Sequence, residues 1–224
     1  MNLQRLPLVL LAAYTLLAAD PVADVLARMD RAASAFRSLS ADVHNVTHTD
    51  VINTDEKESG STLVKRVKAN DLRMLTELRE PDPKTVVFQG GKAEMYLPKA
   101  QVVQVYDAGK YKGLLEKFFL LGFGVPAADL QKDYAIRAIG EETIDSQNAA
   151  HLELIPKSPE TLKHLKKVEL WILDSGYPVR QKFHQSGGDY RMVTYSNTKI
   201  NPDISDNDLK LKVPKGVKQE YPGK

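Results

Sequence analysis

The chain of 224 residues contains no cysteine. No disulfide can therefore stabilise it in an oxidising compartment, and the packing of its core must do so instead. A bacterial lipoprotein carries its lipid on a cysteine that follows the signal sequence, so lipidation of that kind is excluded as well.

The sequence also lacks the common enzyme motifs, namely the G-x-S-x-G elbow, the P-loop and H-E-x-x-H. His151 and Glu153 have the H-x-E spacing of zinc deaminases, but the cysteines that would complete such a site are missing. Gly122 and Gly124 supply only part of a dinucleotide-binding fingerprint. We therefore expect no enzyme activity, no catalytic residue and no cofactor.

A metal site is not expected either. His44 and His48 resemble a pair of ligands, but in a strand their side chains would lie about 13 Å apart. That separation is too large for both side chains to bind one ion.

Neither sign of charge dominates, because 31 basic residues face 29 acidic ones and the formal net charge is +2. The two signs are interspersed, which gives no broad basic patch of the kind that nucleic-acid binding needs. Hydrophobic residues make up 42% of the chain, enough for one well-packed domain. We expect a monomeric protein that binds no nucleic acid.

The first residues differ from the rest of the chain. Met1–Ala19 carries a single charge at Arg5, then the apolar run Leu6–Leu17 and small residues at its end. This pattern is typical of a secretory signal peptide that is cleaved on export. The alternative is a membrane anchor, but a spanning helix needs about 20 apolar residues and this run is shorter. We expect residues 1–19 to be the signal and residues 20–224 to form one domain.

A helix is predicted at the start of this domain. Asp20 is a suitable N-cap residue, and Pro21 follows it at the first helical position. Apolar residues then recur at helical spacing, which predicts a helix that ends near Arg37 and packs one face on a sheet. The apolar positions are Val22, Val25, Leu26, Met29, Ala33 and Phe36.

Short apolar runs separated by turn formers fill the stretch from Ser61 to Asp107, which predicts an antiparallel meander. The predicted strands are Leu63–Val67, Leu72–Leu78, Thr85–Phe88, Ala93–Leu97 and Val102–Tyr106. We expect one face of this meander to be apolar, either as an ordinary core or as the lining of a cavity. The side chains assigned to that face are Leu72, Met74, Leu78, Met95, Leu97, Val103 and Val105.

The remaining segments continue the pattern of strands and turns. A strand is predicted over Ser40–Ile52, followed by a polar loop or hairpin tip at Asn53–Gly60, and a short helix is predicted over Pro126–Asp133. Further strands are predicted at Tyr134–Ile139, His151–Ile155, Val168–Leu173, Pro178–Gln185, Tyr190–Asn201 and Leu209–Val213.

The segment Lys110–Gly124 is more apolar than a surface helix should be. It is either a buried helix or a lid that covers an apolar cavity and moves aside for a ligand, with glycines at its borders that permit the motion. The residues assigned to this lid are Leu114, Leu115, Phe118, Phe119 and Leu121.

Several motifs occur in a characteristic order. They are Val64-Lys65-Arg66, Leu72-Arg73-Met74, Pro81, Val86–Lys92, Met95–Pro98 and the late Leu211–Val217. This order resembles the LolA family of periplasmic lipoprotein carriers over nearly the whole predicted domain. The chain departs from the family at Val67, where a proline is common after the arginine, and at Leu72 and Met74, which replace aromatic residues.

The resemblance implies an α+β fold that is mainly antiparallel β, a strongly curved and unclosed barrel with helices forming a lid over an apolar cavity. It implies a soluble periplasmic carrier that binds the acyl chains of lipoproteins and moves them from the inner to the outer membrane. The implied partners are acylated lipoproteins, an inner-membrane Lol ABC transporter, and a LolB-like receptor or the outer membrane itself. The resemblance also makes Arg66 a latch that holds the lid shut, where composition alone favours a solvated surface charge.

Two other functions remain open on the sequence. One is a regulator that senses lipoproteins and is related to RseB, although such proteins have an additional C-terminal domain. The other is a carrier of glycolipid or of another membrane lipid, although known mycobacterial carriers of that kind are themselves lipid-anchored.

Overall fold

The computed structural model describes residues 21–68, 71–107, 109, 113 and 119–222. The segment predicted to be a signal peptide lies outside these residues. The described strands form one 12-stranded sheet in the order β12-β6-β5-β4-β3-β2-β1-β11-β10-β9-β8-β7. The elements are α1 (Pro21–Ala35), β1 (Ser38–Thr49), η1 (Asp50–Ile52), β2 (Thr54–Lys68), β3 (Asp71–Glu80), β4 (Lys84–Gln89), β5 (Lys92–Leu97), β6 (Val102–Asp107), α3 (Ala127–Asp133), β7 (Tyr134–Ile144), β8 (Gln147–Pro156), α4 (Pro159–Leu162), β9 (Leu165–Leu173), β10 (Pro178–Gln185), η3 (Ser186–Gly188), β11 (Tyr190–Ile200) and β12 (Lys218–Glu220).

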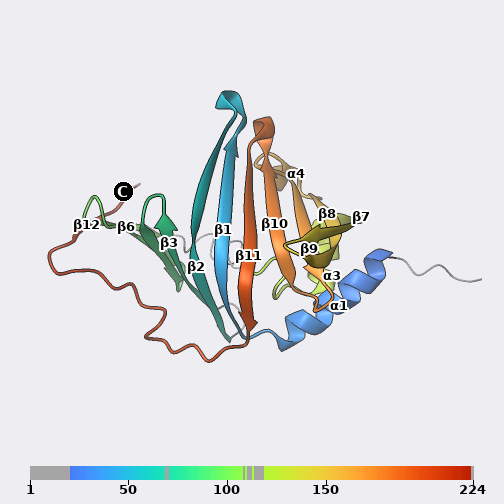
Figure 1. The fold of residues 1–224 in the computed structure, drawn as a ribbon, viewed down its shortest axis with the longest axis horizontal. Coiled ribbons are helices and arrows are strands. Elements are labelled where there is room, and N and C mark those ends of the chain that lie inside the picture. The colour runs from blue at the N-terminus through green and yellow to red at the C-terminus, as the bar shows by residue number, and fades with distance from the viewer. Residues whose placement is uncertain (1–20, 69–70, 108, 110–112, 114–118, 223–224) are drawn as a thin grey trace, which may run out of the picture.

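The sheet curves strongly but does not close. Figure 1 shows it bending from β12 and β6 on one side, through the tall strands β2, β1, β11 and β10, to β8 and β7 on the other. Neighbouring strands are antiparallel except for β12, which pairs with β6 in parallel. The structure therefore confirms the curved, unclosed and mainly antiparallel sheet that the family resemblance implies.

Alternation along the strands directs one apolar face toward the inside of the curve. In β8 the side chains of Leu152 and Leu154 are buried in the same cluster as Leu170 of β9, whereas His151 and Glu153 alternate with them and point the other way. We call the first side the concave face and the second the convex face. Each strand thus gives one set of side chains to the core and the other to the outer surface.

Helix α1 covers the concave face near β8, β9 and β10, as its apolar stripe predicts. Met29 is 1% exposed at the centre of that stripe. The Tyr177 hydroxyl donates to the Ala32 carbonyl at 3.0 Å, and Asp30 accepts from the Ala127 amide at 2.6 Å. These contacts attach the helix to the turn before β10 and to the start of α3.

The polar stretch Asn53–Gly60, predicted to be a loop or a hairpin tip, begins at the hairpin turn and is otherwise strand. Strand β2 begins at Thr54 and stays in register with β1 from there onward. The turn is η1, and it ends at Asn53 in the left-handed conformation with φ 46°. The β1–β2 ribbon extends beyond the core (Figure 1), so much of this part of β2 is exposed and its sequence lacks apolar alternation.

The predicted strand at Leu209–Val213 is also absent. Instead Ile204 and Leu209 pack against Leu75 and Val87 on the convex face, with no strand pairing. We call residues 201–217 the strap, because they run along the outside of the sheet from β11 to β12 (Figure 1). The strap alternates apolar and polar residues as a strand would. It does so because single apolar side chains of an irregular segment are buried against the sheet.

Among the described residues, no helix combines the length and the apolar character that a membrane crossing would require.

A row of ionisable side chains crosses the convex face from β7 to β10. Glu153, whose side chain is only 6% exposed, accepts from Arg137 at 2.6 Å and from Lys167 at 3.0 Å. Burial alone would raise the pKa of Glu153, but the two hydrogen-bonded cations outweigh it and hold the pKa below its ordinary value. Burial would likewise raise the pKa of Glu169, but its hydrogen bonds to His184 and Lys167 outweigh burial and hold the pKa below its ordinary value.

This row predicts a loss of stability in acid. A carboxylate whose pKa is lower in the folded state than in the unfolded chain adds stability above the unfolded value of about 4.3. That stability is lost as the pH falls through the folded-state pKa. Melting temperatures measured between pH 6 and pH 3 should therefore fall more steeply for the parent than for Glu153→Gln. The exposed Glu160, paired with Lys163, gives the control Glu160→Gln, which should follow the parent. Equal pH profiles for the parent and Glu153→Gln would contradict the prediction.

Candidate functional site

One short segment fills the concave face. It runs from Phe119 to Val125, and we call it the plug. Its side chains join two apolar clusters, since Leu121 and Val125 pack with the α1, β8 and β9 core while Phe123 packs with Val64 and Leu72 of β2 and β3. Because one segment reaches strands from both halves of the sheet, the sheet must wrap around it.

Phe123 is the centre of the plug, and its side chain is 2% exposed. Its ring meets Tyr195 of β11 edge-on at 5.1 Å between centroids, and it lies 6.1 Å from Phe36 and 6.2 Å from Tyr177. Contacts of this kind each contribute about 0.5–1.5 kcal/mol beyond their buried area. The plug is therefore held mainly by apolar and aromatic contacts, which an apolar ligand could replace.

Arg66 of β2 bonds to the plug through its guanidinium. One terminal nitrogen donates to the Gly124 carbonyl at 2.5 Å, and the other donates to the Ala33 carbonyl in the last turn of α1 at 3.4 Å. The guanidinium also lies 5.3 Å from the centroid of the Phe36 ring. Burial lowers the pKa of Arg66, although an arginine remains charged at any physiological pH. Arg66 thus connects the plug, the helix and the sheet.

Gly124 permits this close approach. A Cβ atom at this position would lie 1.9 Å from the Arg66 guanidinium nitrogen and 3.3 Å from the Phe36 ring. Any other residue would displace the arginine or push the plug outward. Glycine is therefore required at this position for the hydrogen bond to form.

A second pair of side chains binds the plug further along. The Gln181 amide nitrogen donates to the Leu121 carbonyl, and the Tyr195 hydroxyl donates to the Gln181 side-chain oxygen at 2.8 Å. Gln181 is 3% exposed. Burial of the Tyr195 hydroxyl raises its pKa far above neutrality, so the hydroxyl keeps its proton and stays a donor. The amide is thereby oriented with its nitrogen toward the plug.

Most of the residues predicted to line a cavity lie on the concave face. Leu72 and Met74 of β3 pack in the cluster that contains Phe123, and Leu78 on the same side of β3 is 5% exposed. Register extends this face to β5, where Met95 pairs with Val86 of β4. Leu97 alternates with Met95 on the same side of β5, and both side chains are half-buried.

The assignment of Val103 and Val105 to this face is wrong. Val103 pairs with Tyr96 and Val105 pairs with Glu94, and directly paired residues share a face of the sheet. Tyr96 and Glu94 alternate with Met95, so both valines point to the convex side. In the sequence of β6, Val102 and Val103 are adjacent apolar residues. The sequence alone therefore does not show which of them points to the concave face.

The predicted lid lies only in part among the described residues. Leu114, Leu115 and Phe118 fall outside them. Phe119 lies 5.4 Å from Phe88 between ring centroids, and Leu121 is 3% exposed, so both are at the concave face.

The sequence analysis gave no role to Phe123, Gln181 or Tyr195, and it treated Gly124 only as a glycine at the border of the lid. The Gly122-Phe123-Gly124 spacing contained the signal, since paired glycines around an aromatic indicate a tight backbone approach as well as a nucleotide loop. Gln181 and Tyr195 carry no local signal, because only the pairing of β10 with β11 brings them together beneath the plug.

Lys65, next to the proposed latch, has a different role. Its ammonium group donates to the Ile204 carbonyl at 2.8 Å and to Asp206 at 3.0 Å, and Arg73 bonds the same carboxylate at 2.9 Å. Lys65 thus attaches the strap to the convex face. Replacing Lys65 would therefore disturb the strap, so Lys65 cannot serve as a neutral control for Arg66.

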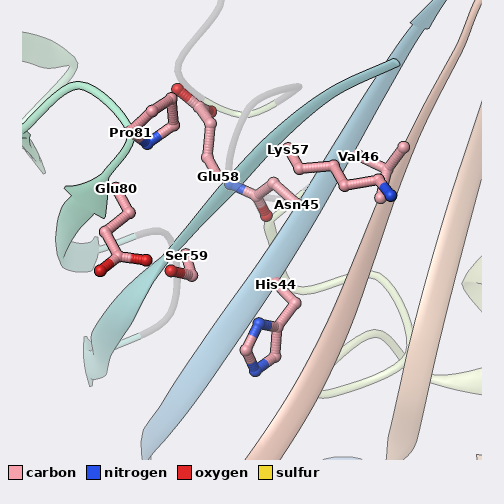
Figure 2. A pocket seen from close by; sticks show the side chains of 8 residues that line it. All are labelled: His44, Asn45, Val46, Lys57, Glu58, Ser59, Glu80 and Pro81. Atoms are coloured by element: carbon pink, nitrogen blue, oxygen red, sulfur yellow. The ribbon is translucent and has the colours of Figure 1, made fainter.

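A separate pocket lies on the β1–β2 ribbon beside the turn after β3. Figure 2 shows its polar and charged lining, in which Glu58 and Glu80 are carboxylates and Val46 and Pro81 are the apolar members. The other lining residues are His44, Asn45, Lys57 and Ser59. No group of three or more metal-ligating side chains is found in the part of the chain that the structure describes.

Comparison with known proteins finds no matching family model and no matching curated protein. Solved structures do match. MucB aligns at 15% identity and a TM-score of 0.52, covering 85% of this chain and 62% of MucB, so this chain spans less than two thirds of that protein. Lipoprotein LppX of Mycobacterium tuberculosis aligns at 16% identity and a TM-score of 0.50, over 84% of this chain and 100% of LppX. A LolA superfamily protein of Nitrosomonas europaea matches at 15% identity and a TM-score of 0.39, over 87% and 99%. At these identities the likeness to MucB and LppX shows a shared fold and nothing more.

The contact between Arg66 and Gly124 gives a prediction about stability. Gly124→Ala should destabilise the protein by about 1–3 kcal/mol, because its methyl group overlaps the guanidinium. In an Arg66→Ala background the same substitution should cost much less, since the space is then free. Melting curves of the two single variants, the double variant and the parent give the coupling. An equal cost of Gly124→Ala in both backgrounds would show that Arg66 is not what the glycine accommodates.

Proposed function

Starting from the LolA/LolB-like fold, we propose that the protein is a carrier that holds the acyl chains of lipoproteins against its concave face. The observation that carries the proposal is the plug. An apolar segment without regular strand pairing is buried in the curve of the sheet, where side-chain donors bind its backbone carbonyls. A ligand of similar chemistry can take its place.

The energetics of such a carrier require a competitor for the ligand. Each buried CH₂ group is worth about 0.8 kcal/mol, so a long acyl chain gains on the order of 10 kcal/mol in an apolar site. A site that was empty and open would hold its cargo too tightly to give it up. The plug lowers the apparent affinity, because the cargo must displace it before binding.

Arg66 fits the role of a latch for the closed state. Its bonds to the carbonyls of Gly124 and Ala33 exist only while the plug and α1 are both seated. Arginine suits this role, since its planar group presents several donors in fixed directions. The latch favours the empty, closed protein and so favours release of cargo.

The proposed setting follows from the predicted signal at residues 1–19. The protein would be exported and act in the periplasm as a monomer without catalytic activity. It would receive lipoproteins from an inner-membrane Lol ABC transporter and pass them to a LolB-like receptor or to the outer membrane. The fold likeness to LppX, which is named as a lipoprotein, and to MucB is compatible with lipid or lipoprotein binding.

MucB has been solved in complex with MucA, so the likeness also favours a second candidate, a lipoprotein-sensing regulator that acts by binding a partner protein. A regulator need only bind, whereas a carrier must also deliver its cargo. Identification of co-purified lipoproteins by mass spectrometry, followed by a transfer assay, separates the two functions.

The latch predicts a kinetic phenotype. Arg66→Leu should bind acylated lipoprotein but transfer it to acceptor membranes at least tenfold more slowly, because losing charge-assisted hydrogen bonds destabilises the closed state by about 1.5–3 kcal/mol. The rate of transfer from loaded carrier to vesicles, followed by fluorescence of labelled cargo, measures this.

The matched control is Arg79→Leu, on β3 with a side chain that is 61% exposed. It should transfer cargo at the parent's rate. Transfer by Arg66→Leu as fast as by the parent would make Arg66 a structural residue and remove the latch.

A further inference from the structure

The plug presents backbone carbonyls, not side-chain groups, to the polar donors of the concave face. Leu121 offers its carbonyl to Gln181, and Gly124 offers its carbonyl to Arg66. These carbonyls lie three residues apart on either side of Phe123, and so within about 11 Å of each other. The plug thus combines apolar side chains with neighbouring carbonyl acceptors.

When the plug leaves, Gln181 loses the Leu121 carbonyl and Arg66 loses the Gly124 carbonyl, although Arg66 still has the Ala33 carbonyl of α1. Gln181 is 3% exposed, so in the loaded protein its amide nitrogen would face the ligand and little water. A buried donor left without an acceptor is unfavourable, and a site built around such a donor discriminates against ligands that lack the acceptor. A pure hydrocarbon would leave the Gln181 amide nitrogen unpaired and one terminal nitrogen of Arg66 without the acceptor that the plug supplies.

We propose that Gln181 binds an ester carbonyl of the cargo's diacylglyceryl group, and that the plug imitates this group in the empty protein. The proposal rests on the proposed function, because it assumes that cargo replaces the plug. Acyl esters place a carbonyl at the head of each apolar chain, which reproduces the arrangement of apolar groups and acceptors in the plug. Arg66 is the donor available to the second ester.

Tyr195 positions the amide. Its hydroxyl donates to the Gln181 oxygen at 2.8 Å, which leaves the amide nitrogen directed at the ligand. Without this bond the amide could turn its oxygen toward the ligand, where it would repel a carbonyl. Tyr195 therefore acts through Gln181 and needs no contact with the cargo itself.

The test compares two synthetic probes with the full mature protein. One is a peptide whose cysteine carries a dipalmitoylglyceryl group with ester linkages, and the other has ether-linked alkyl chains of equal length and no carbonyl. Displacement of an environment-sensitive apolar dye gives both affinities. The parent should prefer the ester probe roughly tenfold, the value of one to two hydrogen bonds.

Gln181→Met keeps the side-chain volume and removes the donor, so the ratio of the two affinities should fall close to one. Tyr195→Phe should lower the ratio to an intermediate value, and it provides the test if Gln181→Met does not fold. The matched control is Thr62→Val, which removes a buried concave-face hydroxyl that bonds Thr76 at 2.9 Å and not the plug. This variant should keep the parent's ratio.

The outcomes separate this inference from the carrier function. If neither probe displaces the dye from the parent, the proposed function fails. If both probes displace it equally well from the parent, or if the preference persists in Gln181→Met and Tyr195→Phe, the ester site is overturned while the carrier function stands.

Discussion

The structure depends on the contact between the plug and the concave face of the sheet. Strands from both halves of the sheet meet at Phe123, and Phe36, the residue that follows helix α1, packs against the same ring. The apolar contacts supply most of the stabilisation, while the bonds of Arg66 and Gln181 to backbone carbonyls fix where the segment lies. A core completed by one short, separately held segment can in principle open without unfolding the sheet.

Much of the architecture could be predicted from the sequence, because alternation and turn residues act locally. The strands of the meander, the helix that begins at Pro21 and the strand Pro178–Gln185 are found where these patterns place them. The concave positions Leu72 and Met74 follow from alternation within one strand. Arg66 could be singled out only through the family resemblance, since a lone arginine in a strand is usually solvated.

The wrong predictions concern residues whose facing or contacts depend on partners that are distant in the sequence. Register between β5 and β6 turns Val103 to the convex face, and this register cannot be read from β6 alone. Leu209 is apolar because it packs against Leu75, which is more than a hundred residues away in the sequence. In the sequence alone, this apolar position looks like part of an alternating strand. Gln181 and Tyr195 became part of the site only through the pairing of β10 with β11. Local patterns predict elements, whereas partners on other strands determine the site.

The central claim is that cargo and plug compete for the same face. Within the plug, the amides of Phe123 and Gly124 both donate to the Leu120 carbonyl at 2.9 Å, so their hydrogen exchange reports whether the plug is seated. Exchange should be measured with and without saturating acylated peptide. The account predicts that loading accelerates exchange at these two amides while the β8 and β9 amides stay protected. Unchanged or slower exchange at Phe123 and Gly124 in the loaded protein would contradict it.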